Sequence, residues 1–252
     1  MTSNFPGTAI VTGGSGGIGA AVTQGLLDKG LDVVVWDLDF SKSEISGKAI
    51  RIECDVTNEK SVKDAIEQTR EKSKDVRYLV NCAGILTASR ILGKHGPASL
   101  RDFEKTLSVN LTGSFNTMRL VAEVISETNP VNKDGERGAI INLSSIAAFE
   151  GQIGQAAYAA SKGGLAAMTL PAARELASFG IRVVCIAPGI VETSMMKDVP
   201  DHYREKLENE TPFPKRYVQP EEISSVVIHI IENTAINGEI IRVDGGLRLP
   251  VK

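Results

Sequence analysis

A tyrosine and a lysine stand one helical turn apart in the segment YAASK, residues 158–162. On a helix, positions i and i+4 lie on one face, so Tyr158 and Lys162 would present a phenol and an ammonium to the same target. A free phenol, with a pKa of about 10, is a poor base at neutral pH, and a neighbouring cation lowers that pKa by stabilising the phenolate. The pair is suited to proton transfer, although a chance pair on an exposed helix has the same spacing.

The segments that must position this pair alternate between buried strands and helices. Apolar runs predict seven strands, at residues 8–12, 32–36, 49–54, 77–81, 139–144, 182–187 and 239–243. Helical periodicity fills the first intervals, with a helix end at Lys29-Gly30 and a helix N-cap at Thr57. Strand–helix–strand units of this kind form a parallel sheet. We therefore predict an α/β, Rossmann-like, doubly wound three-layer sandwich, with helices on both faces of a seven-stranded parallel sheet.

Composition and charge exclude several classes of function. The 28 lysines and arginines are interspersed with 31 acidic residues, and the net charge is −3, so we expect no nucleic-acid partner. No apolar run is long enough for a membrane span, and the N-terminus has no signal-like segment, so we expect no membrane partner and a cytoplasmic protein. A chain of 252 residues fits one large core, which predicts a single domain.

Cysteines and histidines do not form ligand-like clusters in the sequence. The cysteines are odd in number, widely separated and surrounded by apolar residues, which predicts reduced structural thiols. The histidines are isolated from one another. The residues concerned are Cys54, Cys82, Cys185, His95, His202 and His229. We therefore expect no metal site.

The first predicted strand ends in a glycine-rich turn, TGGSGGIG at residues 12–19, which runs directly into a helix. Parallel sheets bind ligands at the carboxyl ends of their strands. Glycines allow positive φ and a close approach of the backbone to a pyrophosphate, whose charge the helix N-terminus favours. The residues predicted to bind a nucleotide here are Gly13, Gly16, Gly17, Ile18 and Gly19.

The next three strand ends carry further candidates for nucleotide binding. Asp37 follows the turn at roughly the spacing of an acidic residue that binds the adenosine ribose, with Asp39 as the weaker candidate. A carboxylate there would repel a 2′-phosphate, and residues 13–19 contain no lysine or arginine, which favours NAD over NADP. Asp55, followed by Val56, either contacts adenine or caps the next helix. The fourth strand ends in small residues that leave room for the nucleotide, namely Asn81, Cys82, Ala83 and Gly84.

The fifth and sixth strand ends also carry candidate site residues. The fifth ends at Ser144-Ser145, shortly before Tyr158, and Ser145 either takes part in the site or caps the following turn. The sixth ends in PGIVET, whose candidate cofactor-binding residues are Pro188, Val191 and Thr193. Because six consecutive strand ends carry residues compatible with a ligand, chance is a poor explanation of the tyrosine–lysine pair.

Together, TGGSGGIG, NCAG, Asn110, Ser145, YAASK and PGIVET resemble the motifs of the short-chain dehydrogenase/reductase family over essentially the whole chain. The resemblance implies hydride transfer with NAD, in which Tyr158 gives or takes the proton and Ser145 holds the substrate oxygen. It further implies that Lys162 bonds the nicotinamide ribose and that Asn110 positions a proton-relay water, where the alternative for Asn110 is a solvent-facing helix position. It also implies a homotetramer.

Longer segments resemble one branch of that family, the type-two 3-hydroxyacyl-CoA dehydrogenases: AAFEGQIGQAAYAASKGG, MTLPAARELA, TPFPKR and NGEIIRVDGGLR. The resemblance implies a substrate with a 3-hydroxy or 3-keto group on an acyl-CoA thioester. The alternatives are a 3-oxoacyl-carrier-protein reductase, a hydroxysteroid dehydrogenase and, in another class, a non-catalytic NAD-binding scaffold. We assign nucleotide binding to about residues 8–145 and catalysis with substrate binding to about residues 145–252.

The substrate is expected to lie between the loop at 147–155 and the segment at 188–214. Its 3-keto oxygen would sit between Ser145 and Tyr158, and Gln152 would offer an amide to the thioester or pantetheine. The apolar side chains expected along these walls are Phe149, Ile153, Met195, Met196 and Phe213; their alternative role is to pack a lid. The long insertion at 85–99 would border the entrance.

Overall fold

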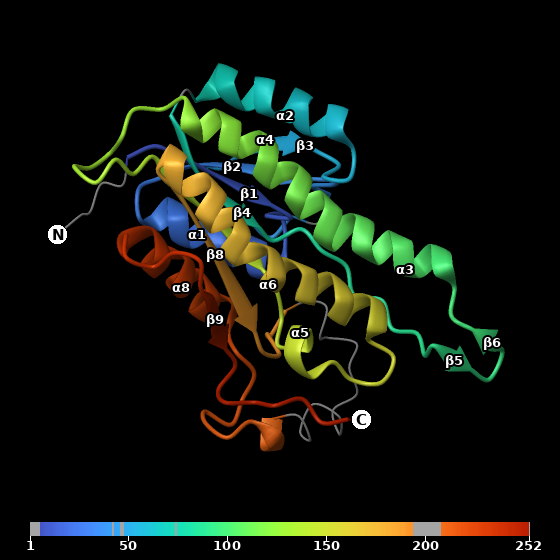
Figure 1. The fold of residues 1–252 in the computed structure, drawn as a ribbon. Helices are drawn as coiled ribbons and strands as arrows, with labels where there is room; N and C mark the ends of the chain where they lie inside the picture. Colours follow the sequence, from blue (N-terminus) through green and yellow to red (C-terminus); the bar gives the residue numbers. More distant parts are fainter. Residues whose placement is uncertain (1–5, 42, 46–47, 74, 194–207, 252) are drawn as a thin grey trace.

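The computed structural model describes residues 6–41, 43–45, 48–73, 75–193 and 208–251. Its centre is a parallel seven-stranded sheet with the strand order β3-β2-β1-β4-β7-β8-β9 (Figure 1). The strands are β1 (Thr8–Thr12), β2 (Asp32–Asp37), β3 (Ile50–Glu53), β4 (Val76–Asn81), β7 (Gly138–Leu143), β8 (Ile181–Pro188) and β9 (Ile240–Val243). The predicted fold is confirmed, and the strands lie almost where the apolar runs place them.

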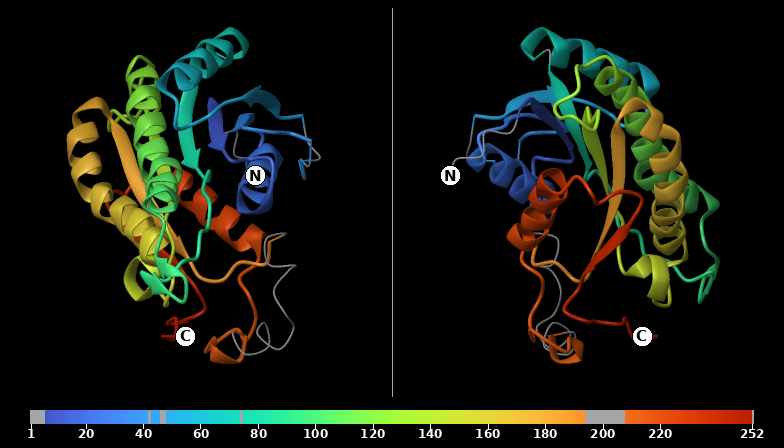
Figure 2. Two further views of the ribbon diagram at one scale, coloured as in Figure 1. Left: turned by 90° about the vertical axis from the view of Figure 1, so that its right-hand side faces the viewer. Right: turned by 60° about the vertical axis from the view of Figure 1, so that its left-hand side comes forward.

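Helices cover both faces of the sheet (Figure 2). One face packs against α1 (Gly17–Asp28) and α8 (Pro220–Glu232), and the other against α2 (Glu59–Lys72), α4 (Ser114–Ser126) and α6 (Ala156–Leu176). Alternation along β2 explains the two layers, because side chains of a strand point to opposite faces in turn. Val33 and Val35 join the cluster with α1 and α8, whereas Val34 and Trp36 join the cluster with α2, α4 and α6.

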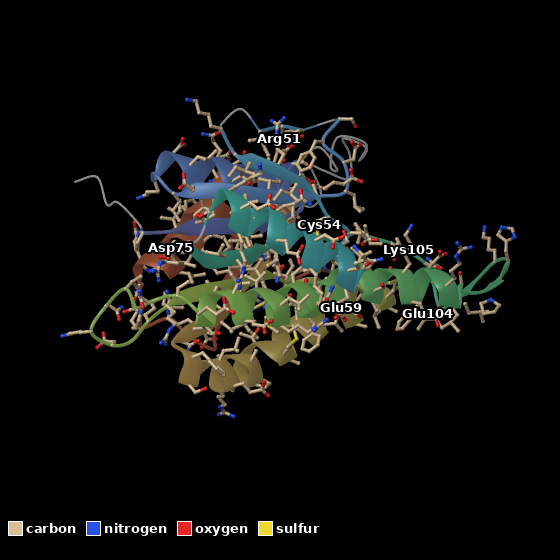
Figure 3. The ribbon with its side chains drawn as sticks, turned by 90° about the horizontal axis from the view of Figure 1, so that it is seen from above. Arg51, Cys54, Glu59, Asp75, Glu104 and Lys105 are labelled. Carbon is tan, nitrogen blue, oxygen red and sulfur yellow. The ribbon has the colours of Figure 1, made fainter. Side chains whose placement is uncertain are left out.

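A long helical rod runs beside the sheet and extends past it. It consists of α3 (Leu100–Leu107), the π-helical segment η1 (Ser108–Gly113) and α4. Figure 3 shows α3, with Glu104 and Lys105, beyond the end of the sheet. The predicted long insertion before α3 contains a small hairpin of β5 (Leu92–Gly93) and β6 (Gly96–Pro97), which projects from the body (Figure 1).

Two short helices complete the described elements, namely α5 (Ala147–Glu150) and the 3₁₀ turn η2 (Ala177–Phe179). The predicted end of α1 is confirmed, because Lys29 is its C-cap and Gly30 adopts a positive φ of 84°. The predicted N-cap of α2 is wrong. Asn58 holds that position and accepts a hydrogen bond from the Ser61 amide, whereas the Thr57 hydroxyl donates to Asp55 instead.

The order of the strands reverses between β1 and β4. The chain moves outward from β1 to β2 and β3, then returns to β4 on the other side of β1. The carboxyl edge at such a switch point is where open α/β sheets bind ligands. Among the described residues, no helix is long and apolar enough to cross a membrane, and no three metal-ligating side chains come together.

Candidate active site

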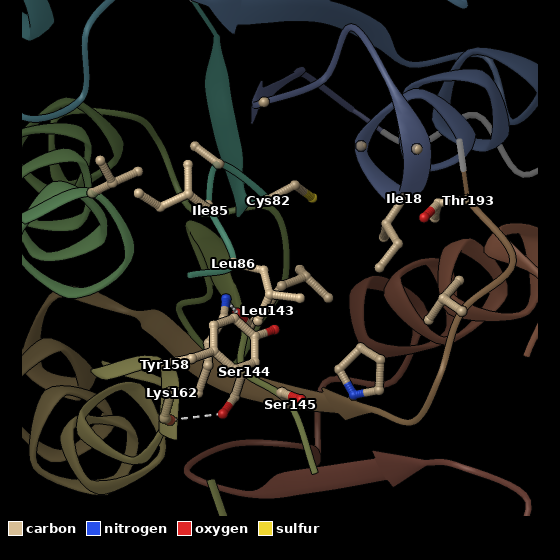
Figure 4. A pocket seen from close by; sticks show the side chains of 18 of the residues that line it. Ile18, Cys82, Ile85, Leu86, Leu143, Ser144, Ser145, Tyr158, Lys162 and Thr193 are labelled. Atoms are coloured by element: carbon tan, nitrogen blue, oxygen red, sulfur yellow. Dashed lines mark hydrogen bonds between the residues drawn. The ribbon is translucent and has the colours of Figure 1, made fainter. Parts of the chain in front are cut away.

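A cavity of about 760 Å³ opens at the carboxyl edge of the sheet, over the switch point (Figure 4). It collects residues from the ends of six strands, as the sequence predicts. Those of the predicted site residues that line it are Gly13, Gly16, Gly17, Ile18, Gly19, Asp37, Asp55, Val56, Cys82, Ala83, Gly84, Ser145, Gln152, Tyr158, Lys162, Pro188, Val191 and Thr193. Asn81 and Asn110 do not line it.

The glycine-rich turn is packed so closely that a side chain would clash at Gly13, Gly14 and Gly19. A Cβ on Gly19 would lie 2.1 Å from the Gly13 carbonyl oxygen, and one on Gly13 would lie 2.7 Å from the Cα of Ala83. Gly16 differs, since no atom lies within 4 Å of its Cβ position. Gly16 therefore keeps space in the cavity free, whereas Gly13 and Gly19 allow the turn, the helix and the end of β4 to meet.

Two carboxylates hold the glycine-rich turn. Asp37 accepts hydrogen bonds from the amide of Ser15 at 3.1 Å and from its hydroxyl at 2.5 Å. Glu44 accepts one from the amide of Gly17, the first residue of α1, at 2.9 Å. The backbone amide of Glu44 also donates to the Ser15 carbonyl at 2.7 Å. The segment after β2 is thus fastened to the turn by both side chain and backbone.

Asp55 at the end of β3 does not cap α2, so that alternative is wrong. One of its carboxylate oxygens accepts from the amide and the hydroxyl of Thr57, at 2.9 and 2.7 Å, which closes a local turn. Asp55 nevertheless lines the cavity together with Val56. It therefore stays a candidate for the adenine end.

Asn81 lies beneath the cavity in a buried polar network. Its amide donates to the Asn142 side chain at 2.9 Å and accepts from the Thr117 hydroxyl at 2.8 Å. The network ties β4 to β7 and α4, so Asn81 supports the floor of the cavity. Cys82, next in sequence, does line the cavity, and burial raises the pKa of its thiol to about 12. All three cysteines are free, as predicted.

Tyr158 and Lys162 lie side by side at the start of α6, and both face the cavity (Figure 4). The Lys162 ammonium is 5.7 Å from the centroid of the Tyr158 ring and donates to the Leu143 carbonyl at 2.6 Å. Burial lowers the pKa of Lys162 to about 8, so the side chain is mostly charged at neutral pH. Between the two, Ser161 is buried and donates a hydrogen bond to the Tyr158 carbonyl at 2.8 Å.

The expected downward shift of the Tyr158 pKa is not found. Burial raises the pKa of the phenol above its ordinary value, and a hydrogen bond with Ser145 opposes that shift only in part. Removing the ring from water penalises the phenolate, and Lys162 is not among the groups that shift this pKa. At neutral pH the phenol is therefore protonated, which is the form that donates a proton.

Ser145 both closes the following turn and lines the cavity. Its hydroxyl accepts a hydrogen bond from the amide of Ala147 at 3.1 Å, which fixes the turn into α5. The same side chain lines the cavity and bonds Tyr158. A carbonyl oxygen placed between the two hydroxyls would meet two donors.

Asn110 is fully buried, so its solvent-facing alternative is wrong. It lies in the π-helical segment η1, a helix type often found at functional sites. Its amide is engaged on three sides: Oδ1 accepts from the Ile85 amide at 2.8 Å, and Nδ2 donates to the Ile85 carbonyl at 2.9 Å and to the Ser161 hydroxyl at 3.0 Å. These bonds connect the end of β4 to the helix that carries Tyr158.

Comparison with known proteins identifies the family. The family described as short chain dehydrogenase matches residues 7–204. The chain belongs to this family. It is 46% identical to 3-hydroxyacyl-CoA dehydrogenase type-2 of Bos taurus and 45% identical to that of Homo sapiens, each over 96% of this chain and 95% of the relative. A 3-oxoacyl-[acyl-carrier-protein] reductase of Thermotoga maritima is 33% identical over 94% of this chain and 96% of its own.

A solved structure agrees with the sequence comparison. The crystal structure of 3-hydroxyacyl-CoA dehydrogenase type-2 from Mycobacterium avium superposes with a TM-score of 0.93, covers all of both chains and is 41% identical. As a short-chain dehydrogenase, the protein is an oxidoreductase that uses a nicotinamide cofactor and acts on a small molecule.

Several residues of this short-chain dehydrogenase site escape sequence reasoning. Ile85 and Leu86, just after NCAG, line the cavity, and so does Leu249 near the C-terminus. Ile85 and Leu86 open the insertion at 85–99 that the sequence predicts at the entrance, so the insertion is the signal that could have singled them out. Leu249 carries no such signal, because only the path of the chain after β9 brings it to the cavity.

The predicted apolar walls are largely wrong among the described residues. Phe149, Ile153 and Phe213 do not line the cavity; they are 50%, 48% and 83% exposed. Ile153 instead lines a second hollow of about 390 Å³ beside the hairpin insertion. Met195 and Met196 lie outside the described residues.

Proposed function

We propose that the protein transfers a hydride between NAD(H) and the 3-hydroxy or 3-keto group of an acyl-CoA thioester. One observation carries the proposal: Ser145, Tyr158 and Lys162 share a single cavity with the glycine-rich turn and Asp37. The relatives named 3-hydroxyacyl-CoA dehydrogenase type-2 supply the substrate class.

The residues present fit a dinucleotide. The open Cβ position of Gly16 leaves room where a pyrophosphate would cross the N-terminus of α1. Thr193 packs against the start of α1, with its methyl carbon 3.4 Å from the Gly17 Cβ position, so the PGIVET segment closes this side of the cavity. The cofactor would supply the hydride, and the chain would orient the nicotinamide with Lys162 and the PGIVET segment, including Pro188 and Val191.

Asp37 supports NAD rather than NADP. A carboxylate at the end of β2 favours ribose hydroxyls and repels a 2′-phosphate. Lys162 is the only lysine or arginine among the described residues lining the cavity, and it lies at the catalytic end. Nothing among those residues would neutralise a phosphate near Asp37.

Proton transfer falls to Tyr158. Its raised pKa keeps the phenol protonated, so it can donate to the oxygen of a ketone as a hydride reaches the carbon. The nearby Lys162 cation then stabilises the phenolate that is left behind. Ser145 donates a second hydrogen bond to the same oxygen and fixes its position. In the reverse direction Tyr158 accepts the hydroxyl proton.

Substrate selectivity tests this proposal. We expect NADH-dependent reduction of acetoacetyl-CoA with a kcat/KM well above that for a free keto-steroid or a carrier-protein thioester. Oxidation of 3-hydroxybutyryl-CoA should be measurable at alkaline pH, because the released proton favours that direction. Efficient reduction of a steroid with no turnover of acetoacetyl-CoA would contradict the acyl-CoA assignment and leave the oxidoreductase intact.

We further propose a homotetramer. The family resemblance supports it, as do large apolar side chains exposed on helices, such as Phe115 on α4 and Leu170 on α6, at 48% and 45%. Light scattering should give four times the 26.9-kDa mass of the chain. A monomer at micromolar concentration would contradict this assignment.

A further inference from the structure

The chain after β9 returns to the loop that follows Ser145. Arg242 in β9 donates two hydrogen bonds to Glu150, the last residue of α5: Nη1 to Oε1 at 2.8 Å and Nη2 to Oε2 at 2.9 Å. Both side chains are 24% exposed. The two parallel bonds use the planar fork of arginine, which fixes orientation as well as distance.

Arg242 is itself held before it reaches Glu150. Its Nε donates to Asp244 at 2.7 Å, and its Nη2 also donates to the Leu247 carbonyl at 3.1 Å. The guanidinium carbon lies 5.3 Å from the centroid of the Phe149 ring. These contacts fix the orientation of the Arg242 guanidinium, and Glu150 binds to a group that is already held in place.

The other end of α5 holds Ser145. The Ser145 hydroxyl accepts from the Ala147 amide, and its carbonyl accepts from the Ala148 amide at 3.0 Å. Since α5 spans only residues 147–150, a single helical turn separates the Ser145 hydroxyl from the Glu150 carboxylate. A shift of Glu150 would therefore reach the Ser145 hydroxyl through this one turn of helix.

Beyond Glu150, the C-terminal segment makes two more contacts with the loop. The Gln152 side chain donates to the Pro250 carbonyl at 3.3 Å, and the Ile153 amide donates to the Val251 carbonyl at 3.2 Å. Gln152 and Leu249 both line the cavity. The same segment thus forms part of the wall and holds the opposite part in place.

We propose that Arg242 and Glu150 are a positioning pair, which fixes the Ser145 hydroxyl for the carbonyl under reduction and holds Gln152 in the cavity wall. The pair touches neither substrate nor cofactor and acts through α5. This inference rests on the proposed function, because it assigns Ser145 to the reacting oxygen.

Hydrogen–deuterium exchange tests the mechanical part without any substrate. Glu150→Gln and Arg242→Gln should each speed exchange in a peptide covering residues 145–157, which contains the amides of Ala147 and Ile153. The matched control is Glu136→Gln, which breaks the more buried Arg182–Glu136 pair just before β7, at the opposite edge of the sheet. It should lower Tm without changing exchange in that peptide. Unchanged exchange in both pair variants overturns the proposal.

Kinetics test the functional part. Misplacing a group that acts on the reacting atoms lowers kcat more than it raises KM, so we expect kcat to fall by on the order of 10-fold and KM to change by less than about 3-fold. The double variant should be no slower than Arg242→Gln alone, because removing Arg242 already breaks its contact with Glu150. Arg242→Lys, which keeps the charge but loses the fork, should recover part of kcat.

The outcomes separate the two proposals. Faster exchange with normal kcat in both pair variants would leave the contact structural and overturn its positioning role. If the wild-type protein does not reduce acetoacetyl-CoA, the proposed substrate is wrong. The positioning role is still tested with any ketone that the wild type does reduce, by comparing kcat of the variants with kcat of the wild type.

Discussion

The two ends of the cavity are built from different parts of the polypeptide. At the nucleotide end, the backbone shapes the site: Gly13 and Gly19 allow the turn to pack, and Gly16 leaves a space open. At the reacting end, side chains carry the chemistry, and burial sets the pKa values of Tyr158 and Lys162. The nucleotide end should therefore be sensitive to added volume, and the reacting end to a lost functional group.

The largest effect is expected from Tyr158→Phe, which keeps the ring and removes the proton donor. Turnover should fall by on the order of 10² to 10⁴ while NADH affinity changes little. Steady-state kinetics and NADH titration measure the two quantities. Tyr78→Phe, which removes a phenol from β4, serves as the matched control and should keep turnover near normal. A Tyr158→Phe enzyme with normal turnover would refute the role of the phenol.

Added volume at the nucleotide end should give the next largest effect. Gly16→Val places its side chain in open cavity space, so the protein should fold with a nearly unchanged Tm. NADH affinity should fall by at least about 10²-fold, because the side chain takes the space of the pyrophosphate. By contrast, Gly19→Val should fail to fold, since its Cβ meets the Gly13 carbonyl at 2.1 Å. Normal NADH binding by Gly16→Val would place the nucleotide elsewhere.

At the nucleotide end, Asp37 is the side chain that should decide between NAD and NADP. Asp37→Ala should lower NAD affinity by roughly 10- to 100-fold, the value of hydrogen bonds to a charged group, and leave NADP affinity unchanged or higher. Calorimetric titration with both nucleotides measures the gap. Asp39→Ala, two residues further on, is the control and should keep the preference. Equal affinity of the wild type for NAD and NADP would refute the assignment.

The pKa of Lys162 at the reacting end predicts a pH dependence. Its pKa of about 8 means that the cation is present below pH 8 and lost above it. If the charge is needed to stabilise the Tyr158 phenolate, kcat for ketone reduction should fall about tenfold from pH 7 to pH 9. Lys162→Arg keeps its charge over this range, so its profile should be flat. A tenfold fall in both enzymes would assign the titration to another group.

The smallest effect is expected from the substrate wall. Leu249→Ala removes part of a half-buried side chain, which corresponds to about 1 kcal/mol and a rise of roughly 3- to 5-fold in KM for acetoacetyl-CoA. NADH affinity should stay the same. Val131→Ala, an exposed apolar residue remote from the cavity lining, is the matched control. A change in NADH affinity, with KM for acetoacetyl-CoA unchanged, would show that Leu249 contacts the nucleotide and not the substrate.

The sequence predicts the nucleotide end better than the reacting end. The glycine-rich turn, Asp37 and the NCAG segment follow directly after strands, and the parallel sheet brings all strand ends to one edge. Apolar periodicity is a local property, so the order of strands and helices can be read from it. The residues at these ends are then correctly gathered into one cavity.

What the sequence could not predict depends on contacts between distant segments. The pKa of Tyr158 rises because packing around α6 buries the ring, and spacing alone indicated the opposite shift. Leu249 reaches the cavity only because the chain turns back after β9. The N-cap of α2 is Asn58 and not Thr57, because the helix begins at Glu59 and the Asn58 side chain accepts from the Ser61 amide. Each of these depends on tertiary or competing local bonds that no periodicity reveals.

Glu44 places a negative charge on the amide that opens α1. An anionic ligand that uses the Gly17 amide must first displace this carboxylate, and the two negative groups repel each other as the ligand approaches. Salt weakens that repulsion, because mobile ions screen exposed charges. We therefore expect a nucleotide that binds at this amide to enter faster as the ionic strength of the surrounding medium rises.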